Sequence, residues 1–367
     1  MPGFWRKNQV TVLMTTACNL QCSYCYMPKM REKIDERTID VEFAKIGIKD
    51  FFCNNSENNL RFFSPGEPTQ AFPQMKEIYE YAKNIAGTSL TTELESNGYF
   101  DKVIRDWIAS NISYFWISCD GKPEWQERQR IHGNTKINPE TIYENIRFFV
   151  QQTNLLFGVS ATISEKNLDK QVELIDFFHS LGIKYVCGKP IYSSHQKPHL
   201  RAASMLEFAK NFVPAFYHAK ELGMFYQTLA ITNFDEKVTY YCQAHTPTPR
   251  LTPDGFVSCC DWASVGPHHL KPDALKELIY GYYDKDKKCI IYDEKQIEKI
   301  KSRNVDVLSQ KECRGCEALY HCAGGCVGKM SAVTNDFYKV SDSWCEATRY
   351  LFQHLPIDTG DFPFLHP

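Results

Sequence analysis

Short apolar segments alternate with longer amphipathic segments over the first half of the chain. The short segments are rich in β-branched and aromatic residues and end at turn formers, which predicts strands at 9–15, 60–64, 90–96, 113–119, 155–163 and 183–188. The segments between them have the apolar spacing of helices, at 38–53, 72–86, 101–109, 139–152 and 168–181. This alternation predicts an α/β fold with a parallel sheet and right-handed crossovers.

Six strands are fewer than the eight of a complete closed barrel, so we expect a partial (β/α)6 barrel. Its ligands should bind at the carboxyl ends of the strands. One more helix is expected at 203–222. From Cys242 onward the alternation stops and cysteine, glycine and proline become frequent, which predicts a loop-rich domain held by metal. We therefore expect a barrel domain at 1–234 and a second domain at 235–367.

Charge and hydropathy exclude several classes of function. The formal net charge is −2, so the chain lacks the basic field of many nucleic-acid-binding proteins. It has no apolar run of about 18 residues that predicts a membrane span. Its N-terminal segment also lacks the features of a secretory signal. We expect a cytoplasmic protein that binds neither nucleic acid nor membranes.

The chain has 15 cysteines, although it has no secretory signal. Because the cytosol keeps thiols reduced, they indicate metal or cofactor ligation before disulfide bonds. Three lie near the N-terminus, and nine lie between Cys242 and Cys345. We expect the isolated Cys53, Cys119 and Cys187 to be small buried apolar side chains.

Cys18, Cys22 and Cys25 follow the first expected strand with the spacing C-x3-C-x2-C. Three thiolates on one loop can ligate three irons of a [4Fe–4S] cluster, in which full thiolate ligation takes four. The missing ligand leaves one iron open to an outside molecule. The alternative is a zinc loop whose fourth ligand comes from elsewhere in the chain.

This spacing, with Tyr24 before the third cysteine, resembles the signature of the radical S-adenosylmethionine (SAM) superfamily. The resemblance implies that SAM binds the open iron. Reduction by a flavodoxin- or ferredoxin-type donor then yields a 5′-deoxyadenosyl radical, which abstracts a substrate hydrogen atom. After the second strand, Gly66 and Glu67 lie in a segment similar to the family's Gly-Gly-Glu-Pro turn, with Pro65 in place of its first glycine. After the third, Asn97 lies in a turn similar to the family's Thr-Asn-Gly.

After the fourth strand, Ser118 and Arg130 match positions in a segment of one subgroup of this family, where the serine contacts the SAM ribose. Gln126 and Glu127 stand where that subgroup has histidine and aspartate, so we carry over no role tied to that pair. Without the resemblance, Asp120 reads as a plain turn residue. The cofactor-binding residues that the resemblance implies are Tyr24, Gly66, Glu67, Asn97, Ser118 and Arg130.

The C-terminal cysteines resemble the seven-cysteine pattern of the SPASM extension, which occurs in radical SAM maturases of peptides and of anaerobic sulfatases. The resemblance implies two auxiliary [4Fe–4S] clusters beside the SAM-binding one, three in all. Structural zinc is the alternative, because C-x2-C is also half of a zinc ribbon. The implied ligands are Cys242, Cys260 and Cys326 for the first auxiliary cluster, and Cys313, Cys316, Cys322 and Cys345 for the second.

Full thiolate ligation of two clusters takes eight ligands, and the pattern supplies seven. Sulfatase-maturating relatives draw the eighth from a cysteine just upstream of the first, where residues 233–241 contain none. Cys259 adjoins Cys260, and neighbouring side chains diverge, so its binding to the same cluster is awkward. Cys187 is a distant alternative. Either an unusual residue completes the first auxiliary cluster, or one iron is open and binds substrate.

Two further residues are candidates for substrate chemistry. Asp261 follows Cys260 and matches an aspartate that removes the substrate proton in sulfatase-maturating relatives. A partly desolvated carboxyl group there would have its pKa raised toward the range of a general base, whereas the simpler reading is a turn aspartate. Cys187 ends the sixth strand, where its thiol is placed to donate a hydrogen atom as radical SAM epimerases require, although core packing explains it equally simply.

The resemblance implies an oxidoreductase that abstracts a C–H hydrogen from a peptide or protein residue, which is then oxidised or cross-linked. Many peptide-modifying relatives begin with a leader-recognition domain. Cys18 lies too near the start for one, so we expect recognition in the barrel or by a separate recognition protein. One alternative is a SAM-dependent dehydrogenase or epimerase of a small metabolite, with a closed pocket. The other is a non-catalytic zinc scaffold.

Overall fold

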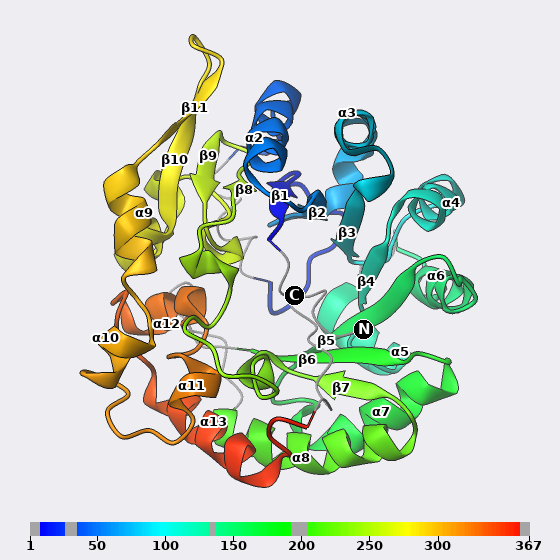
Figure 1. The fold of residues 1–367 in the computed structure, drawn as a ribbon. Coiled ribbons are helices and arrows are strands. Elements are labelled where there is room, and N and C mark those ends of the chain that lie inside the picture. The colour runs from blue at the N-terminus through cyan, green and yellow to red at the C-terminus, as the bar shows by residue number, and fades with distance from the viewer. Residues whose placement is uncertain (1–7, 26–34, 132–136, 192–203, 360–367) are drawn as a thin grey trace.

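The structure is a computed structural model that describes residues 8–25, 35–131, 137–191 and 204–359. Within these residues, one 11-stranded sheet has the order β11-β10-β9-β8-β1-β2-β3-β4-β5-β6-β7. Its strands curve around the centre of the molecule with helices on the outside (Figure 1). No helix in the described part of the chain is long and apolar enough to cross a membrane.

The six predicted strands are all present and pair in parallel, which confirms the expected α/β fold. They are β1 (Val10–Leu13), β2 (Asn59–Phe63), β3 (Thr91–Ser96), β4 (Tyr114–Ser118), β5 (Leu156–Ile163) and β6 (Tyr185–Pro190). The predicted helices are α2 (Val41–Asn54), α3 (Phe72–Ala86), α4 (Lys102–Asn111), α6 (Glu140–Val150), α7 (Gln171–Ser180) and α8 (Met205–Glu221).

Local side chains explain where several of these helices begin. The Asp40 carboxylate accepts hydrogen bonds from the first free amides of α2, and the Asp101 carboxylate does the same for α4. Such caps satisfy amides that have no partner within the helix. The short helix α5 (Pro123–Gln126) begins with proline and passes into a π-helical turn, Glu127–Ile131. π-helical turns are rare in proteins, and those that occur are often found at functional sites.

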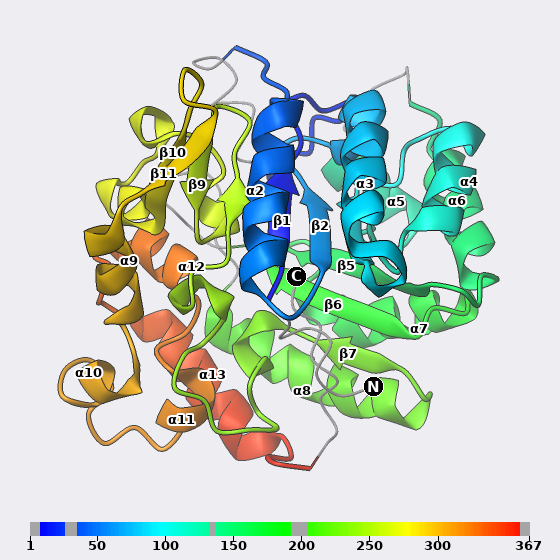
Figure 2. The ribbon, with the colours of Figure 1, turned by 45° about the horizontal axis from the view of Figure 1, so that its top comes forward.

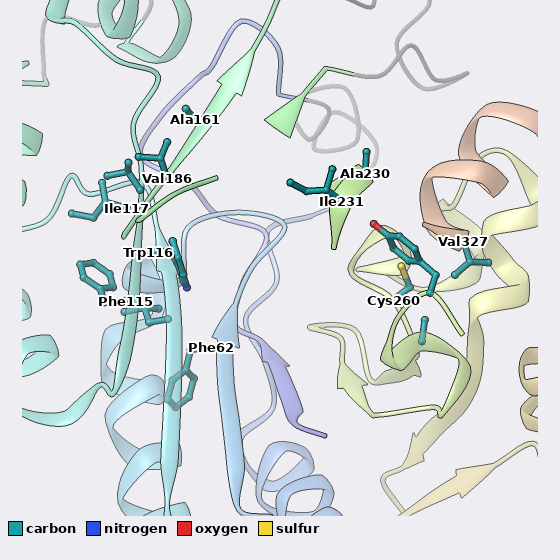
Figure 3. Close-up of a cluster of buried hydrophobic side chains, with 14 of the residues drawn as sticks. Phe62, Phe115, Trp116, Ile117, Ala161, Val186, Ala230, Ile231, Cys260 and Val327 are labelled. Atoms are coloured by element: carbon teal, nitrogen blue, oxygen red, sulfur yellow. The ribbon is translucent and has the colours of Figure 1, made fainter. Parts of the chain in front are cut away.

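Side chains alternate between the two faces of each strand, so each strand contributes to an outer and an inner layer. Figure 3 shows Phe115 and Trp116 pointing to opposite sides of β4. Phe115 packs on Phe149 of α6, with ring centroids 4.5 Å apart. A Cβ at Gly158 of β5 would lie 2.2 Å from the Trp116 ring, so this glycine makes room for the indole.

Five strands were not predicted. They are β7 (Phe225–Gln227), β8 (Arg250–Leu251), β9 (Phe256–Ser258), β10 (Ile279–Asp284) and β11 (Cys289–Tyr292). Strand β8 pairs in parallel with β1, and the strands from β8 to β11 pair antiparallel in succession. The sheet therefore continues across the domain boundary that we expected near residue 235.

The C-terminal segment also folds against the barrel. Its helices are α9 (Glu294–Lys301), α10 (Val305–Ser309), α11 (Leu319–Cys322), α12 (Val327–Thr334) and α13 (Asp342–His354). Helix α13 lies along α8, as Figures 1 and 2 both show. Cys119 and Cys187 are buried as expected, whereas Cys53 is exposed, because it lies on the solvent side of the last turn of α2.

Candidate active site

The carboxyl ends of β1 and β2 bring the Cys18 loop against the turn that contains Gly66. The Gly66 amide donates to the carbonyl of Thr15 (3.1 Å), and the Glu67 amide donates to the carbonyl of Ala17 (2.7 Å). A Cβ built on Gly66 would lie 2.0 Å from the Ala17 carbonyl oxygen. The close approach of the two backbones therefore requires glycine at this position.

The Glu67 carboxylate joins the second turn to the third. Its Oε1 accepts from the Thr69 amide (3.1 Å), the Thr69 hydroxyl (2.8 Å) and the Ser96 hydroxyl (2.8 Å). Its Oε2 accepts from the Asn97 amide (2.7 Å). Burial raises the pKa of Glu67, and these four donors oppose that shift by favouring the ionised form. The Glu67 carboxylate is thus occupied by hydrogen bonds inside the protein, where it joins the two turns.

Asn97 connects the third turn to the first cysteine. Its Nδ2 donates to Oδ1 of Asn19 (2.7 Å) and reaches the Cys18 Sγ at 3.9 Å. The Asn19 side chain in turn donates to the carbonyl of Tyr99 (2.8 Å). The Leu20 amide donates to the Cys18 Sγ at 3.4 Å. Hydrogen bonds to a thiolate favour its ionised, metal-binding form.

Tyr24 is held by a buried ion pair that follows β4. The Tyr24 hydroxyl donates to Oδ2 of Asp120 (2.8 Å) and accepts from Nε of Arg130 (2.6 Å). Arg130 lies 3.4 Å from Oδ1 of Asp120, which also accepts from the Thr162 amide (3.0 Å). Burial raises the pKa of Tyr24, so its hydroxyl stays neutral and remains a donor. The π-helical turn presents Arg130 and also receives the Ser23 amide at the Gln129 carbonyl (2.8 Å).

Sequence reasoning missed Asp120, which looked like an ordinary turn residue. Asp120 contacts Gln126, which occupies one of the two positions that depart from the subgroup pattern. The Asp120 amide donates to Oε1 of Gln126 (2.9 Å), whose Nε2 reaches the Tyr99 hydroxyl at 3.4 Å. Both side chains are completely buried. Ser118 is half-buried at the carboxyl end of β4, beside Ser160 of β5.

Electrostatic interactions connect the C-terminal cysteines within the two sets that the resemblance implies. Burial raises the pKa of Cys242 and of Cys260, and the nearby Cys326 thiol raises both further. Burial likewise raises the pKa of Cys313, and the thiols of the same set, Cys322, Cys345 and Cys316, add to it. The named thiols of each set therefore lie within electrostatic range of one another.

The described residues include no group of three or more His, Cys, Asp or Glu side chains that is gathered to hold a single metal ion. A four-iron cluster is wider than one ion and needs its thiolates farther apart. Two buried polar atoms beside the cysteines, Nη1 of Arg303 and Nε2 of His245, have no hydrogen-bond partner. A soft thiolate donor set with buried donors around it fits iron–sulfur clusters.

Two residues bear on the ligand that the pattern leaves open. Cys259 is fully buried; burial raises its pKa, and the charge of the nearby Cys242 thiol adds to the shift. His245 is buried three residues after Cys242, and its Nδ1 lies 3.4 Å from the Cys242 carbonyl oxygen. The histidine was missed because no spacing of histidines in the sequence suggested a metal site.

Asp261 does not have the raised pKa that we expected. Its Oδ2 accepts from Nη1 of Arg61 (2.7 Å), and its Oδ1 accepts from Nε of Arg250 (3.0 Å). Burial alone would raise the pKa of Asp261, but the two guanidinium groups outweigh it and lower the pKa to about 2. No local pattern could reveal this low pKa, because Arg61 precedes Asp261 by 200 residues.

The ion pair is one side of a charged cluster inside the barrel. Arg61 also faces Glu93 (3.9 Å) and Glu95 (3.7 Å) of β3. Burial raises the pKa of Glu93 to about 7, because the Arg61 charge only partly offsets the desolvation and Glu95 adds repulsion. On the opposite wall, Nζ of Lys189 donates to Glu95 (2.8 Å). The charge of Lys189 also reaches the buried Cys187 thiol.

Fold and site together define an α/β protein with a partial parallel barrel, a three-cysteine loop at its carboxyl edge and further cysteines behind it. Residues 12–178 match the family model of the Radical SAM superfamily. These residues run from β1 through most of α7 and carry every turn described above. The chain therefore contains a radical SAM domain.

Two curated proteins are similar to this chain. An uncharacterized protein of Methanocaldococcus jannaschii is 25% identical over 202 residues, which cover 53% of this chain and 66%, just under two thirds, of that protein. The radical SAM cyclopropyl synthase TigE of Paramaledivibacter caminithermalis is 19% identical over 373 residues, covering 94% of this chain and 73% of TigE.

Solved structures share the fold over nearly the whole chain. The structure of anSMEcpe with bound AdoMet has a TM-score of 0.70 at 15% identity, covering 94% of this chain and 96% of that one. SuiB of Streptococcus suis bound to S-adenosylmethionine has a TM-score of 0.64 at 15% identity, covering 93% and 77%. Because the coverage includes residues beyond the family match, the C-terminal segment shares the fold of these structures as well.

Proposed function

We propose that this protein uses SAM to generate a 5′-deoxyadenosyl radical and abstracts a C–H hydrogen from a residue of a peptide or protein, which is then oxidised or cross-linked. One observation carries the proposal. The Cys18 loop, the Gly66 turn and the Asn97 turn come from three different strands and are tied together at one edge of the sheet. A parallel sheet binds its ligands at that edge.

Within this proposal, Cys18, Cys22 and Cys25 hold the SAM-binding cluster. When bound, this cluster and SAM supply the radical that removes a hydrogen atom. The backbone of Gly66 would bind the methionine end of SAM, and Ser118 would contact the ribose. The Glu67 carboxylate fixes the Gly66 turn through its hydrogen bond from the Asn97 amide. Asp120 and Arg130 hold Tyr24 beside the cysteines.

The two C-terminal cysteine sets hold auxiliary clusters in the same proposal, with Cys242, Cys260 and Cys326 in the first and the other four cysteines in the second. Asp261 lies between the first set and the barrel interior, and we assign it the proton that leaves the substrate. Its ion pairs with Arg61 and Arg250 keep it ionised, so it is ready to accept a proton but is a weak base.

A peptide or protein substrate is the substrate class that the comparisons favour. anSMEcpe has been solved with AdoMet and the Cp18Cys peptide, and SuiB with its precursor peptide SuiA. Both share this chain's fold. A reduced flavodoxin- or ferredoxin-type donor and a separate recognition protein complete the proposal. A small metabolite as substrate remains the alternative outcome of the test below.

The first test measures SAM cleavage. Anaerobically purified protein reduced with dithionite should release 5′-deoxyadenosine from SAM, and the Cys22→Ala variant should release none above background. The Cys53→Ala variant is the matched control, because this cysteine is exposed and apart from all three sets. Equal cleavage by wild type and Cys22→Ala would contradict the proposed SAM site.

The second test identifies the substrate class. Cells grown in deuterated medium are extracted, and the extract is separated into a peptide and protein fraction and a small-molecule fraction. Hydrogen abstraction transfers deuterium into 5′-deoxyadenosine, which mass spectrometry detects. Deuterium transfer from the peptide and protein fraction supports the proposal, and transfer from the small-molecule fraction alone would favour the metabolite alternative.

A further inference from the structure

Arg303 is a buried cation in the loop between α9 and α10, and the proposed function assigns it no role. Its side chain is 0% exposed and is among the largest that are fully buried. Its Nε donates to the Phe337 carbonyl (2.9 Å), and its Nη2 donates to the Gly324 carbonyl (2.9 Å). The third nitrogen, Nη1, is buried without a hydrogen-bond partner. The guanidinium is therefore fixed in place but not fully satisfied.

This guanidinium lies between the two C-terminal cysteine sets. Gly324, which it holds, belongs to the loop that connects Cys322 of the second set to Cys326 of the first. A Cβ on Gly324 would lie 3.1 Å from Nη2, so the loop packs directly on the guanidinium. Four thiols lie within electrostatic range of this guanidinium: Cys313 and Cys322 in the second set, and Cys242 and Cys326 in the first.

Among the described residues, Arg303 forms no ion pair with a carboxylate. Burial disfavours its charged form and lowers the pKa of Arg303, while the surrounding thiols act in the opposite direction. A buried charge without a counter-charge is costly, and proteins pair such charges or place them at metal centres. As cluster ligands, the cysteine sulfurs on both sides would be thiolates and would supply the missing counter-charge.

We propose that Arg303 is a shared counter-cation for the two auxiliary iron–sulfur clusters and raises the reduction potential of both. This inference rests on the proposed function, which places those clusters at these cysteines. A cluster bound by thiolates is anionic and gains negative charge on reduction, so a fixed cation beside it stabilises the reduced form more than the oxidised form. Net charge and hydrogen bonding near the cluster are known determinants of its potential.

A purely structural role for Arg303 makes a different prediction. In that case the two carbonyl hydrogen bonds matter and the charge does not. Arg303→Lys keeps the charge but cannot reproduce the two-sided fork of the guanidinium. Arg303→Gln removes the charge and keeps an amide donor. The pair of variants therefore separates charge from hydrogen bonding.

The experiment is a redox titration followed by electron paramagnetic resonance on the full-length chain. It uses a parent protein in which Cys18, Cys22 and Cys25 are Ala, so that the signals of the auxiliary clusters are seen alone. Arg303→Gln should shift both midpoint potentials to more negative values, whereas Arg303→Lys should keep them near those of the parent. Arg314→Gln is the matched control, because it removes a solvent-exposed charge next to Cys313. Its potentials should stay near the parent values.

Unchanged potentials in Arg303→Gln with full iron content would overturn the inference, and a shift of only one cluster would overturn the shared role. If Arg303→Gln fails to retain iron, the Lys variant decides. Full iron and parent-like potentials in Arg303→Lys would show that the charge is required, as proposed. Loss of iron in Arg303→Lys would show that the two carbonyl hydrogen bonds are required instead, which overturns the inference. A parent without auxiliary iron would instead refute the proposed function itself, so the two failures are distinguishable.

Discussion

Glu67→Gln tests whether the carboxylate inside the turn assembles the SAM site. The substitution keeps the shape of the side chain but replaces one acceptor oxygen with an NH2 group. Oε1 accepts three hydrogen bonds and Oε2 accepts one, so the amide oxygen is expected at the Oε1 position. The new NH2 group then faces the Asn97 amide, which is also a donor.

The structure gives the expected magnitude. The variant loses a hydrogen bond from the Asn97 amide to an ionised group, made at 2.7 Å, and leaves that buried amide without an acceptor. A charge-assisted hydrogen bond contributes about 1.5–3 kcal/mol, and a stranded buried donor costs about 1–3 kcal/mol. Because these costs overlap, the free energy of unfolding should fall by about 3 kcal/mol. Because the Asn97 turn loses one of its two hydrogen bonds to Glu67, SAM affinity should fall as well.

Anaerobic urea unfolding followed by circular dichroism measures the first effect, and equilibrium dialysis of SAM measures the second. The matched control is Glu77→Gln, since this carboxylate is exposed and forms a surface ion pair with Lys45 (2.9 Å). Removing such a pair should cost less than about 1 kcal/mol. If Glu67→Gln costs no more than Glu77→Gln and binds SAM as tightly as wild type, the reasoning is refuted.

Three further changes test other parts of the structure. The pKa of Glu93 is about 7 in the folded state, against 4.5 for an ordinary glutamate, so the folded state keeps this proton to a higher pH than the unfolded state. The free energy of unfolding should therefore decrease by about 3 kcal/mol as the pH rises from 4.5 to about 7. Urea unfolding should show this decrease in wild type and not in Glu93→Gln; parallel pH curves would contradict it. Asp261→Asn leaves the buried Arg61 and Arg250 charges without their shared partner and should cost about 3–5 kcal/mol by the same assay, whereas a loss below about 1 kcal/mol would show that the pairs are weak. Gly66→Ala places a Cβ 2.0 Å from the Ala17 carbonyl oxygen and should abolish SAM binding in dialysis; wild-type affinity would show that the two turns separate easily.

The barrel strands could be predicted because their residues carry a strong local signal. Strand β5, with the sequence LFGVSATI, is mostly apolar and largely buried, as expected of a parallel strand covered on both faces. Strands β8 and β9 are only two and three residues long and lie among prolines and glycines. Their pairing with β1 and with each other depends on distant chain segments, which no local pattern contains.

The candidate site was predictable where function sits in short motifs and not where it depends on distant charges. The motifs around Cys18, Gly66 and Asn97 lie at the ends of adjacent strands, as a parallel sheet requires. The role of Asp120 depends on Tyr24, 96 residues away. The low pKa of Asp261 depends on Arg61 in β2, and sequence alone does not reveal which side chains meet inside the barrel.

The most direct test of the whole account is the iron, sulfide and zinc content of anaerobically purified protein, beside a variant with Cys18, Cys22 and Cys25 all changed to Ala. Three four-iron clusters predict about twelve irons per chain, and about eight in the variant. About eight irons in the wild type would mean that one auxiliary site is not filled as proposed. Zinc without iron would contradict the radical mechanism.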